Sequence, residues 1–292
     1  MIENITSSSQ YLYHYTRADI ALDYIIRNHT LQFGSYTGTN DPKESKFWEF
    51  DLGTNEERDL GKYRMAELSE WLSLALKGKT KLACFSMDAN GLSGDHMRDI
   101  FKRGFCKPRM WAQYADKHSG VCFVFSREKL TKIIEDQFSK DKLVLSGPIT
   151  YKNRNILRNL YNPDDQQYTI NVDYLTKIGR EAYVEAHLKM HYSRLFFEKM
   201  EDWKDESEWR YVIFSQADES LYLNYKDSLV GIMFGEKTDE KTIQDIMDVT
   251  ESWGLRYMGL KWKNCSPWYD YENLRYIPGI KNSPWGQAIK KV

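Results

Sequence analysis

The segment EWRYVIFS at residues 208–215 gives the clearest strand signal in the chain. It is rich in the β-branched and aromatic residues that suit a pleated, buried surface. Its first residue, Glu208, is a carboxylate at the mouth of an apolar run, and burial of such a group is unfavourable unless it has a partner. Arg210 follows two residues later, on the same face of a strand. The segment therefore predicts a central strand that begins with a Glu208–Arg210 pair.

Strand and helix signals alternate irregularly around this segment. Further strands are expected at residues 11–15, 30–36, 81–86, 120–125, 142–151, 221–225, 230–235 and 255–262. Apolar residues at i, i+3 and i+4 spacing predict helices at residues 18–26, at 56–77, after Ser126 and at 240–253. The order is neither a strict β-α-β-α alternation nor all-β, so we predict an α+β fold with a curved, mixed or antiparallel sheet and flanking helices.

A single α+β domain over residues 1–292 is expected, because no Pro/Gly/Ser-rich linker and no internal repeat divides the chain. Residues 164–266 contain no proline, and the first part of this stretch reads as helix with a weak point at Gly179. We therefore expect a long helical insertion at about residues 152–200 and a β-α-β part at about residues 221–262.

The charge balance narrows the classes of partner. Lysine and arginine number 41 against 42 aspartates and glutamates, which leaves a formal net charge of −1. Proteins that bind nucleic acid mainly through its phosphates are usually basic, so the composition disfavours this partner without ruling it out. Apolar runs such as residues 230–234 are far shorter than the ~20 residues of a membrane span, and the N-terminus shows no secretory signal. We expect a soluble cytoplasmic protein with no membrane partner.

Metal-binding signals are weak. None of the four cysteines forms a Cys-x-x-Cys pair, so neither a zinc ribbon nor a thioredoxin-like motif is present. His187 and His191 have the i, i+4 spacing of zinc-binding helices but lack the glutamate of H-E-x-x-H, which favours an ordinary helix. We expect no metal.

Two short motifs near the N-terminus are candidates for ligand contact. Tyr13-His14-Tyr15-Thr16 puts a histidine near the end of the first strand, where a rigid backbone can present it to a ligand. Thr16, with Asp19 three residues later, also resembles a helix cap. Tyr36 is followed by Asn40-Asp41-Pro42 and Glu44, a turn that structure explains as well as function does.

Two later motifs leave a similar choice open. Trp111, Tyr114 and His118 fall at i, i+3 and i+7 on one face of a short helix, which suits a stacking pocket or a stripe of core residues. Residues 201–208 hold five acidic residues and one lysine, as solvated loops often do. Glu206 and Glu208, however, are two apart and would point to the same face of a strand.

Taken in order, these motifs resemble a bacterial family known as domain of unknown function 2971, whose members are often found in phage-defence settings. The resemblance spans residues ~11 to ~262 and rests on Tyr13-His14-Tyr15, Asn40-Asp41-Pro42 with Glu44, Cys84-Phe85-Ser86, Met110-Trp111 with Tyr114 and His118, Gly120-Val121-Cys122, and Glu206-Ser207-Glu208-Trp209-Arg210.

A more distant resemblance is to the ADP-ribosyltransferase fold, in which a first strand carries a histidine or arginine to NAD and a later strand begins with glutamate, often as Glu-x-Glu. His14 and Glu206-x-Glu208 match this order, whereas the Ser-Thr-Ser or His-Gly-Ser blocks of many such enzymes are missing. The resemblance implies catalytic roles for Glu208, Glu206 and His14. It also implies NAD contacts from His14, Tyr15, Thr16, Tyr36, Asn40, Trp111, Tyr114, His118 and Arg210.

The expected function is accordingly that of an NAD-consuming enzyme, an ADP-ribosyltransferase or NAD glycohydrolase, acting as an anti-phage toxin. Cleavage of the nicotinamide bond develops positive charge on the ribose, which Glu208 would stabilise, while Glu206 orients an acceptor and Tyr114 or Trp111 stacks on a ring. Two alternatives stay open: a non-catalytic sensor that binds a phage or nucleotide ligand, and a metal-dependent nuclease using Asp41, Glu44, Asp205, Glu206 and Glu208.

Overall fold

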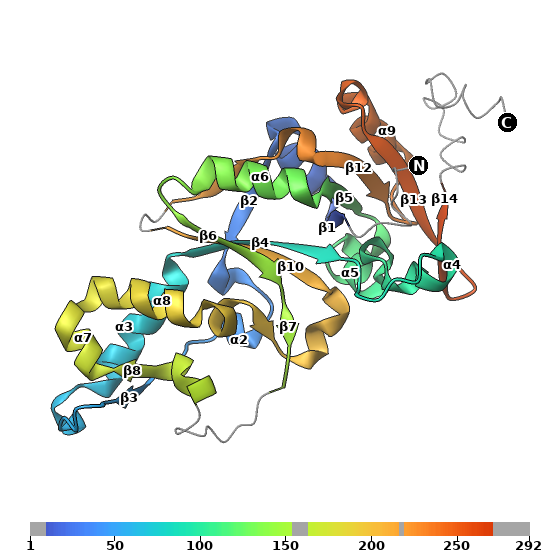
Figure 1. The fold of residues 1–292 in the computed structure, drawn as a ribbon. Helices are drawn as coiled ribbons and strands as arrows, with labels where there is room; N and C mark the ends of the chain where they lie inside the picture. The colour runs from blue at the N-terminus through green and yellow to red at the C-terminus, as the bar shows by residue number, and fades with distance from the viewer. Residues whose placement is uncertain (1–9, 154–162, 216–218, 271–292) are drawn as a thin grey trace, which may run out of the picture.

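The computed structural model describes residues 10–153, 163–215 and 219–270, which form a mixed sheet with helices on both faces (Figure 1). The strands of this sheet are β1 Tyr11–Thr16, β2 Thr30–Ser35, β4 Thr80–Met87, β5 Val121–Ser126, β6 Leu143–Pro148, β10 Glu208–Phe214, β11 Leu221–Asn224, β12 Leu229–Phe234, β13 Arg256–Lys263 and β14 Ser266–Asp270. Neighbouring strands are antiparallel except β12 and β13, which are parallel and joined through a helix. The predicted α+β fold with a mixed sheet is confirmed.

Strand β10 lies in the interior of the sheet, as its sequence predicts. It pairs with β4 along its whole length, from Glu208 opposite Ser86 to Phe214 opposite Thr80, and with β6 on its other side. From Arg210 to Phe214 every residue of β10 is buried, on both faces of the sheet. This explains why the segment is a nearly continuous apolar run rather than an alternating one.

The other edge of β4 is shared by two strands that part from each other. Strand β2 pairs with β4 only at Lys81 and Leu82, and β1 pairs with it only at Ser86 and Met87. Residues 83–85 of β4 therefore have no strand partner on this edge among the described strands, and we call this place the sheet gap. Strand β1 continues along β5, whereas β2 continues along β11.

Helices cover the two faces separately. On one face lie α6 (Arg127–Phe138), α9 (Glu240–Val249) and a helical segment made of α1 (Ala18–Ile20) and a π-helix (Ala21–Ile26), packed on residues such as Phe123 and Phe125. The opposite face carries two groups of helices that belong to two different apolar clusters. The first group is α3 (Met65–Gly78), α7 (Val172–Ile178) and α8 (Arg180–Phe196) (Figure 1). The second is α5 (Pro108–Gln113) with the 3-10 helices Ile100–Lys102 and Gly104–Cys106, which follow α4 (His96–Asp99) in the chain.

Several predicted boundaries differ from the structure. The helix expected at residues 56–77 begins only at Met65, because the backbone before it is held in a loop by Asp173, which accepts from the amides of Asn55 and Glu56. Thr16 does not cap the first helix: Arg17 is its N-cap residue and bonds to Asp19 through its side chain. Within the expected helical insertion, α7 and α8 meet at Gly179, whose φ of 80° suits glycine. Part of that insertion, residues 154–162, lies outside the described residues.

Short elements complete the fold. Strands β3 (Asp51–Gly53) and β8 (Thr169–Asn171) form one parallel pair, and β7 (Thr150–Tyr151) and β9 (Glu198–Lys199) form another. A four-residue helix, α2 (Pro42–Ser45), follows β2. In the part of the chain that is described, no helix has the length and apolar character to cross a membrane.

Candidate functional site

A cavity of about 510 Å³ opens at the sheet gap. This volume lies within the range of small-molecule sites, ~300–1,000 Å³. The wall joins segments that are far apart in the sequence: residues 13–15 of β1, residues 38–41 and Glu44 after β2, residues 82–86 of β4, Met110 and Tyr114, and Lys199, Trp203, Glu206 and Glu208. The split between β1 and β2 thus creates a hollow that an evenly paired sheet would not have.

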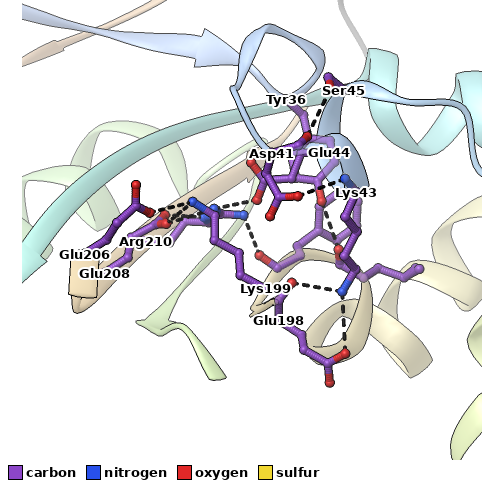
Figure 2. A network of polar contacts seen from close by, with 12 residues as sticks. Tyr36, Asp41, Lys43, Glu44, Ser45, Glu198, Lys199, Glu206, Glu208 and Arg210 are labelled. Carbon is purple, nitrogen blue, oxygen red and sulfur yellow. Dashed lines mark hydrogen bonds and ion pairs between the residues drawn. The ribbon is translucent and has the colours of Figure 1, made fainter. Parts of the chain in front are cut away.

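Glu208 lies at the centre of a buried network of charges on this wall (Figure 2). Its carboxylate accepts from Arg210 Nε at 2.6 Å and Nη2 at 3.1 Å, and pairs with Lys199 Nζ at 2.7 Å. Burial alone would raise the pKa of Glu208, but the charges of Arg210 and Lys199 outweigh it and hold the pKa at about 2. Glu208 is therefore ionised at neutral pH.

Arg210 ties the network to the loop after β2. Its Nη2 lies 2.6 Å from Glu44 Oε1, and its Nη1 donates to the carbonyl oxygen of Phe196 at 2.8 Å. Both Arg210 and Glu44 are fully buried. The Glu208–Arg210 pair expected from the sequence is present, and Glu44 is a further partner of the same guanidinium.

Glu206 reaches the same wall through an unusual backbone turn. It ends a 3-10 helix (Glu201–Glu206), and Ser207, with φ 46° and ψ 55°, turns the chain into β10. The Glu206 carboxylate accepts from Lys199 Nζ at 2.9 Å and from the Tyr114 hydroxyl at 2.9 Å. Lys199 thus bridges Glu206 and Glu208, and these carboxylates raise its pKa although burial acts in the opposite direction.

His14 partly fills the sheet gap. Its Nδ1 lies 3.1 Å from the carbonyl oxygen of Cys84, in the stretch of β4 that lacks a strand partner. A carbonyl oxygen only accepts, so Nδ1 carries the hydrogen. Burial lowers the pKa of His14, which favours the neutral ring with Nε2 as a hydrogen-bond acceptor.

The loop after β2 is fixed by several capping and backbone contacts. Asp41 is the N-cap of α2: its Oδ1 accepts from the amide of Lys43 at 2.9 Å, and Pro42 occupies the first helical position. Lys77 of α3 donates to the carbonyl oxygens of Lys43, Glu44 and Lys46. These contacts hold Asp41 and Glu44 against the cavity.

Five predicted ligand contacts do not lie on the cavity wall. Trp111 is fully buried and donates from Nε1 to the carbonyl of Phe105, so its ring packs in the core instead of stacking on a ligand. The Tyr36 hydroxyl donates to the carbonyl of Leu195. His118 Nδ1 accepts from Trp262 Nε1, at a distance of 3.1 Å. Thr16 ends β1 opposite Val121. Arg210 contacts Glu208 but does not itself line the cavity. By contrast, His14, Tyr15, Asn40, Tyr114, Glu206 and Glu208 all line the cavity.

Sequence reasoning missed Lys199 and Trp203. Lys199 lies in the two-residue strand β9 and Trp203 in the 3-10 helix that follows, and neither element has a periodic pattern. The acidic stretch at residues 201–208 gave one usable signal, because buried carboxylates require cations nearby. Trp203 is flanked by Arg109 at 4.8 Å and Lys199 at 5.3 Å from its ring centre.

A nuclease-type metal site finds no support in the geometry. The structure pairs Glu206 and Glu208 with Lys199, and Glu44 with Arg210. Among the described residues, no three histidine, cysteine, aspartate or glutamate side chains converge as a set of metal ligands.

Part of this site lies in a segment that matches a family model. Residues 110–211 match the family model described as "Protein of unknown function (DUF2971)". The matched segment contains Tyr114, Lys199, Glu206, Glu208 and Arg210, whereas His14 and the loop after β2 lie before it. Comparisons with curated proteins and with solved structures gave no match. The predicted resemblance to domain of unknown function 2971 is confirmed for this segment.

Proposed function

We propose, for a chain whose residues 110–211 match the DUF2971 family model, that the cavity at the sheet gap binds an NAD-type nucleotide and cleaves its bond to nicotinamide. The product is free nicotinamide, with the ADP-ribosyl group passed to water or to another acceptor. The observation that carries the proposal is Glu208, a carboxylate on the cavity wall that stays ionised while buried.

The chemistry needs such a group. As the N-glycosidic bond breaks, its electrons leave with the nicotinamide nitrogen and the ribose carbon becomes cation-like, as in glycoside hydrolysis. A fixed negative charge in a dry pocket stabilises this state because it need not reorganise. Arg210 and Lys199 hold both oxygens of Glu208 in place.

Other residues of the wall supply positioning. The acceptor Nε2 of neutral His14 suits a ribose hydroxyl, and the ring of Tyr114 or Trp203 offers a flat surface for a base. Glu206 lies beside Glu208 through their shared contact with Lys199, where it can receive a proton from an attacking hydroxyl or amine.

A second candidate, binding without turnover, is favoured by one specific observation. Both oxygens of Glu208 already contact cations, which reduces the field that this carboxylate exerts on a ligand. In this alternative the protein senses a nucleotide-like ligand, and the buried charges serve to hold the wall in shape.

The test is release of nicotinamide from NAD by the purified full chain, followed by liquid chromatography. Glu208→Gln should lower the rate by ~10²–10³, the usual effect of removing one preorganised electrostatic group. The matched control is Glu198→Gln: Glu198 is also buried and paired, with Lys43 at 3.6 Å, but does not line the cavity. Absence of nicotinamide release, together with saturable NAD binding, would favour the second candidate.

The phage-defence part of the expectation is a further proposal and has its own readout. If the protein is an effector, induced expression in bacteria should deplete cellular NAD and stop growth, and Glu208→Gln should abolish both effects. Growth arrest without a fall in NAD would argue against this mechanism of toxicity.

A further inference from the structure

Several buried polar atoms on the cavity wall have no hydrogen-bond partner. Thr39 Oγ1, Asp41 Oδ2, Glu44 Oε2 and Ser86 Oγ are such atoms, and all four residues line the cavity. Asp41, Glu44 and Ser86 are at most 1% exposed. Because buried polar groups in native proteins are nearly always hydrogen-bonded, a cluster of unpartnered atoms on a cavity wall indicates that a ligand supplies the partners.

The unpartnered atoms require a donor. Ionised carboxylates only accept hydrogen bonds, and hydroxyl groups can accept as well as donate. Asp41 uses Oδ1 for the cap of α2, and Glu44 uses Oε1 for its ion pair with Arg210. One oxygen of each carboxylate is thus left without a hydrogen-bond partner, like the hydroxyls of Thr39 and Ser86 on the same cavity wall.

The local charge also requires a positive group. The wall carries four carboxylates, those of Asp41, Glu44, Glu206 and Glu208. Lys199 pairs with Glu206 and Glu208, and Arg210 pairs with Glu208 and Glu44, whereas buried Lys77 directs its ammonium at backbone carbonyls. Asp41 forms no ion pair with any described residue, and an uncompensated buried charge is strongly unfavourable. A monovalent cation in the cavity would remove this imbalance.

We propose that Thr39, Asp41, Glu44 and Ser86 form a subsite for a cationic N–H donor, a protonated amine or a guanidinium. Such a group offers several hydrogens to separate acceptors at once. A metal ion would need converging ligands, and the described residues hold no set of three. The inference deepens the proposed function and rests on it in one respect, namely that the cation is the acceptor substrate and not part of NAD.

The experiment compares two probes of the same shape. Methylguanidinium and methylurea differ by one charge, and their binding to the full chain is measured by NMR titration at pH 7 and constant ionic strength. Methylguanidinium should bind at least about tenfold more tightly than methylurea, since a charge-assisted hydrogen bond is the stronger one. Methylammonium in parallel distinguishes an amine from a guanidine as the natural group.

Asp41→Asn locates the site. Asparagine keeps an oxygen for the cap of α2 but removes the charge, so the preference for methylguanidinium should fall at least tenfold. The matched control is Asp239→Asn: Asp239 is also an N-cap residue, bonded to the amide of Thr242, but lies outside the cavity, and binding should not change. Thr39→Val, which leaves the cap untouched, should weaken binding in the same direction.

The inference is overturned if the unmodified protein binds methylurea as tightly as methylguanidinium. It is also overturned if Asp41→Asn and Thr39→Val bind methylguanidinium as tightly as the unmodified protein does. A third refuting result is displacement of methylguanidinium by Mg²⁺, Ca²⁺ or nicotinamide at lower concentration than by methylammonium. These measurements need no turnover. If NAD is not cleaved but the preference for methylguanidinium is present, the proposed function fails and the cation subsite stands.

Discussion

Glu208→Gln is expected to destabilise the protein by about 3 kcal/mol, whatever it does to activity. The two cations beside Glu208 lower its pKa from 4.5 to about 2. That difference corresponds to about 3 kcal/mol in favour of the charged form, at ~1.4 kcal/mol per tenfold change. The loss stays near the lower limit for breaking a buried ion pair, ~3–5 kcal/mol, because Arg210 keeps Glu44 and Lys199 keeps Glu206.

Thermal and urea unfolding measure this cost. In a protein of this size, 1 kcal/mol shifts the melting temperature by ~2–4 °C, so the variant should melt about 6–12 °C lower than the unmodified protein. A group whose folded pKa is lowered stabilises the fold above its unfolded pKa, and the stabilisation disappears as pH falls toward the folded pKa. The difference between the two proteins should therefore be complete above pH ~5 and vanish by pH ~2.

Two outcomes would refute this reasoning. An unchanged melting temperature would mean that the Glu208–Arg210–Lys199 contacts contribute nothing net, so that the carboxylate is available for chemistry at no cost in stability. A difference between the two proteins that does not depend on pH between 6 and 3 would mean that the effect comes from packing and not from the charge. Glu206→Gln, measured in the same way, keeps the contacts of Glu208 and so distinguishes the contributions of the two carboxylates to stability.

Two further pairs of variants test backbone packing at glycine and the anchoring of the loop after β2. Gly235→Ala should destabilise the protein by more than about 3 kcal/mol or prevent folding, because the added methyl group would overlap the carbonyl oxygen of His118. Its control is Gly78→Ala, where the methyl group meets no atom within 4 Å. Urea unfolding should show that this control stabilises the protein by about 0.4–1 kcal/mol. Lys77→Met should lower the free energy of unfolding by about 2–4 kcal/mol, because it removes the donor to three carbonyl oxygens, and should also weaken ligand binding in the cavity. Its control is Lys132→Met, at an exposed ammonium on α6, which should change stability by less than about 0.5 kcal/mol.

The sequence predicts the long elements well because each carries its own periodic pattern. The strands from β1 to β13 that contain six or more residues all lie within two or three residues of their expected positions. Helices α6 and α9 begin where expected, and α9 ends four residues early. Strands of two or three residues, such as β3, β8 and β9, were not expected. Their pairing depends on partners more than 100 residues away, or on a neighbour brought close by the rest of the fold.

The site was predictable in part, for the same reason. The pair of Glu208 with Arg210 follows from their spacing on one strand face. Trp111 and Tyr114 share a helix face in the sequence, but one packs in the core and the other lines the cavity. Which side of a short helix faces a hollow depends on how the sheet splits, and no local pattern contains that information.

The pairing of β10 with β4 also has a consequence for synthesis of the chain. One edge of β4 is completed by β10, and about 120 residues separate Met87 from Glu208. At ~5–20 residues per second, a ribosome needs about 6–24 s to make that interval. Until then β4 has an exposed edge open to wrong pairing, and Glu44 lacks Arg210. A nascent or truncated chain thus holds no assembled cavity, so any activity at this place appears only after most of the protein has been made.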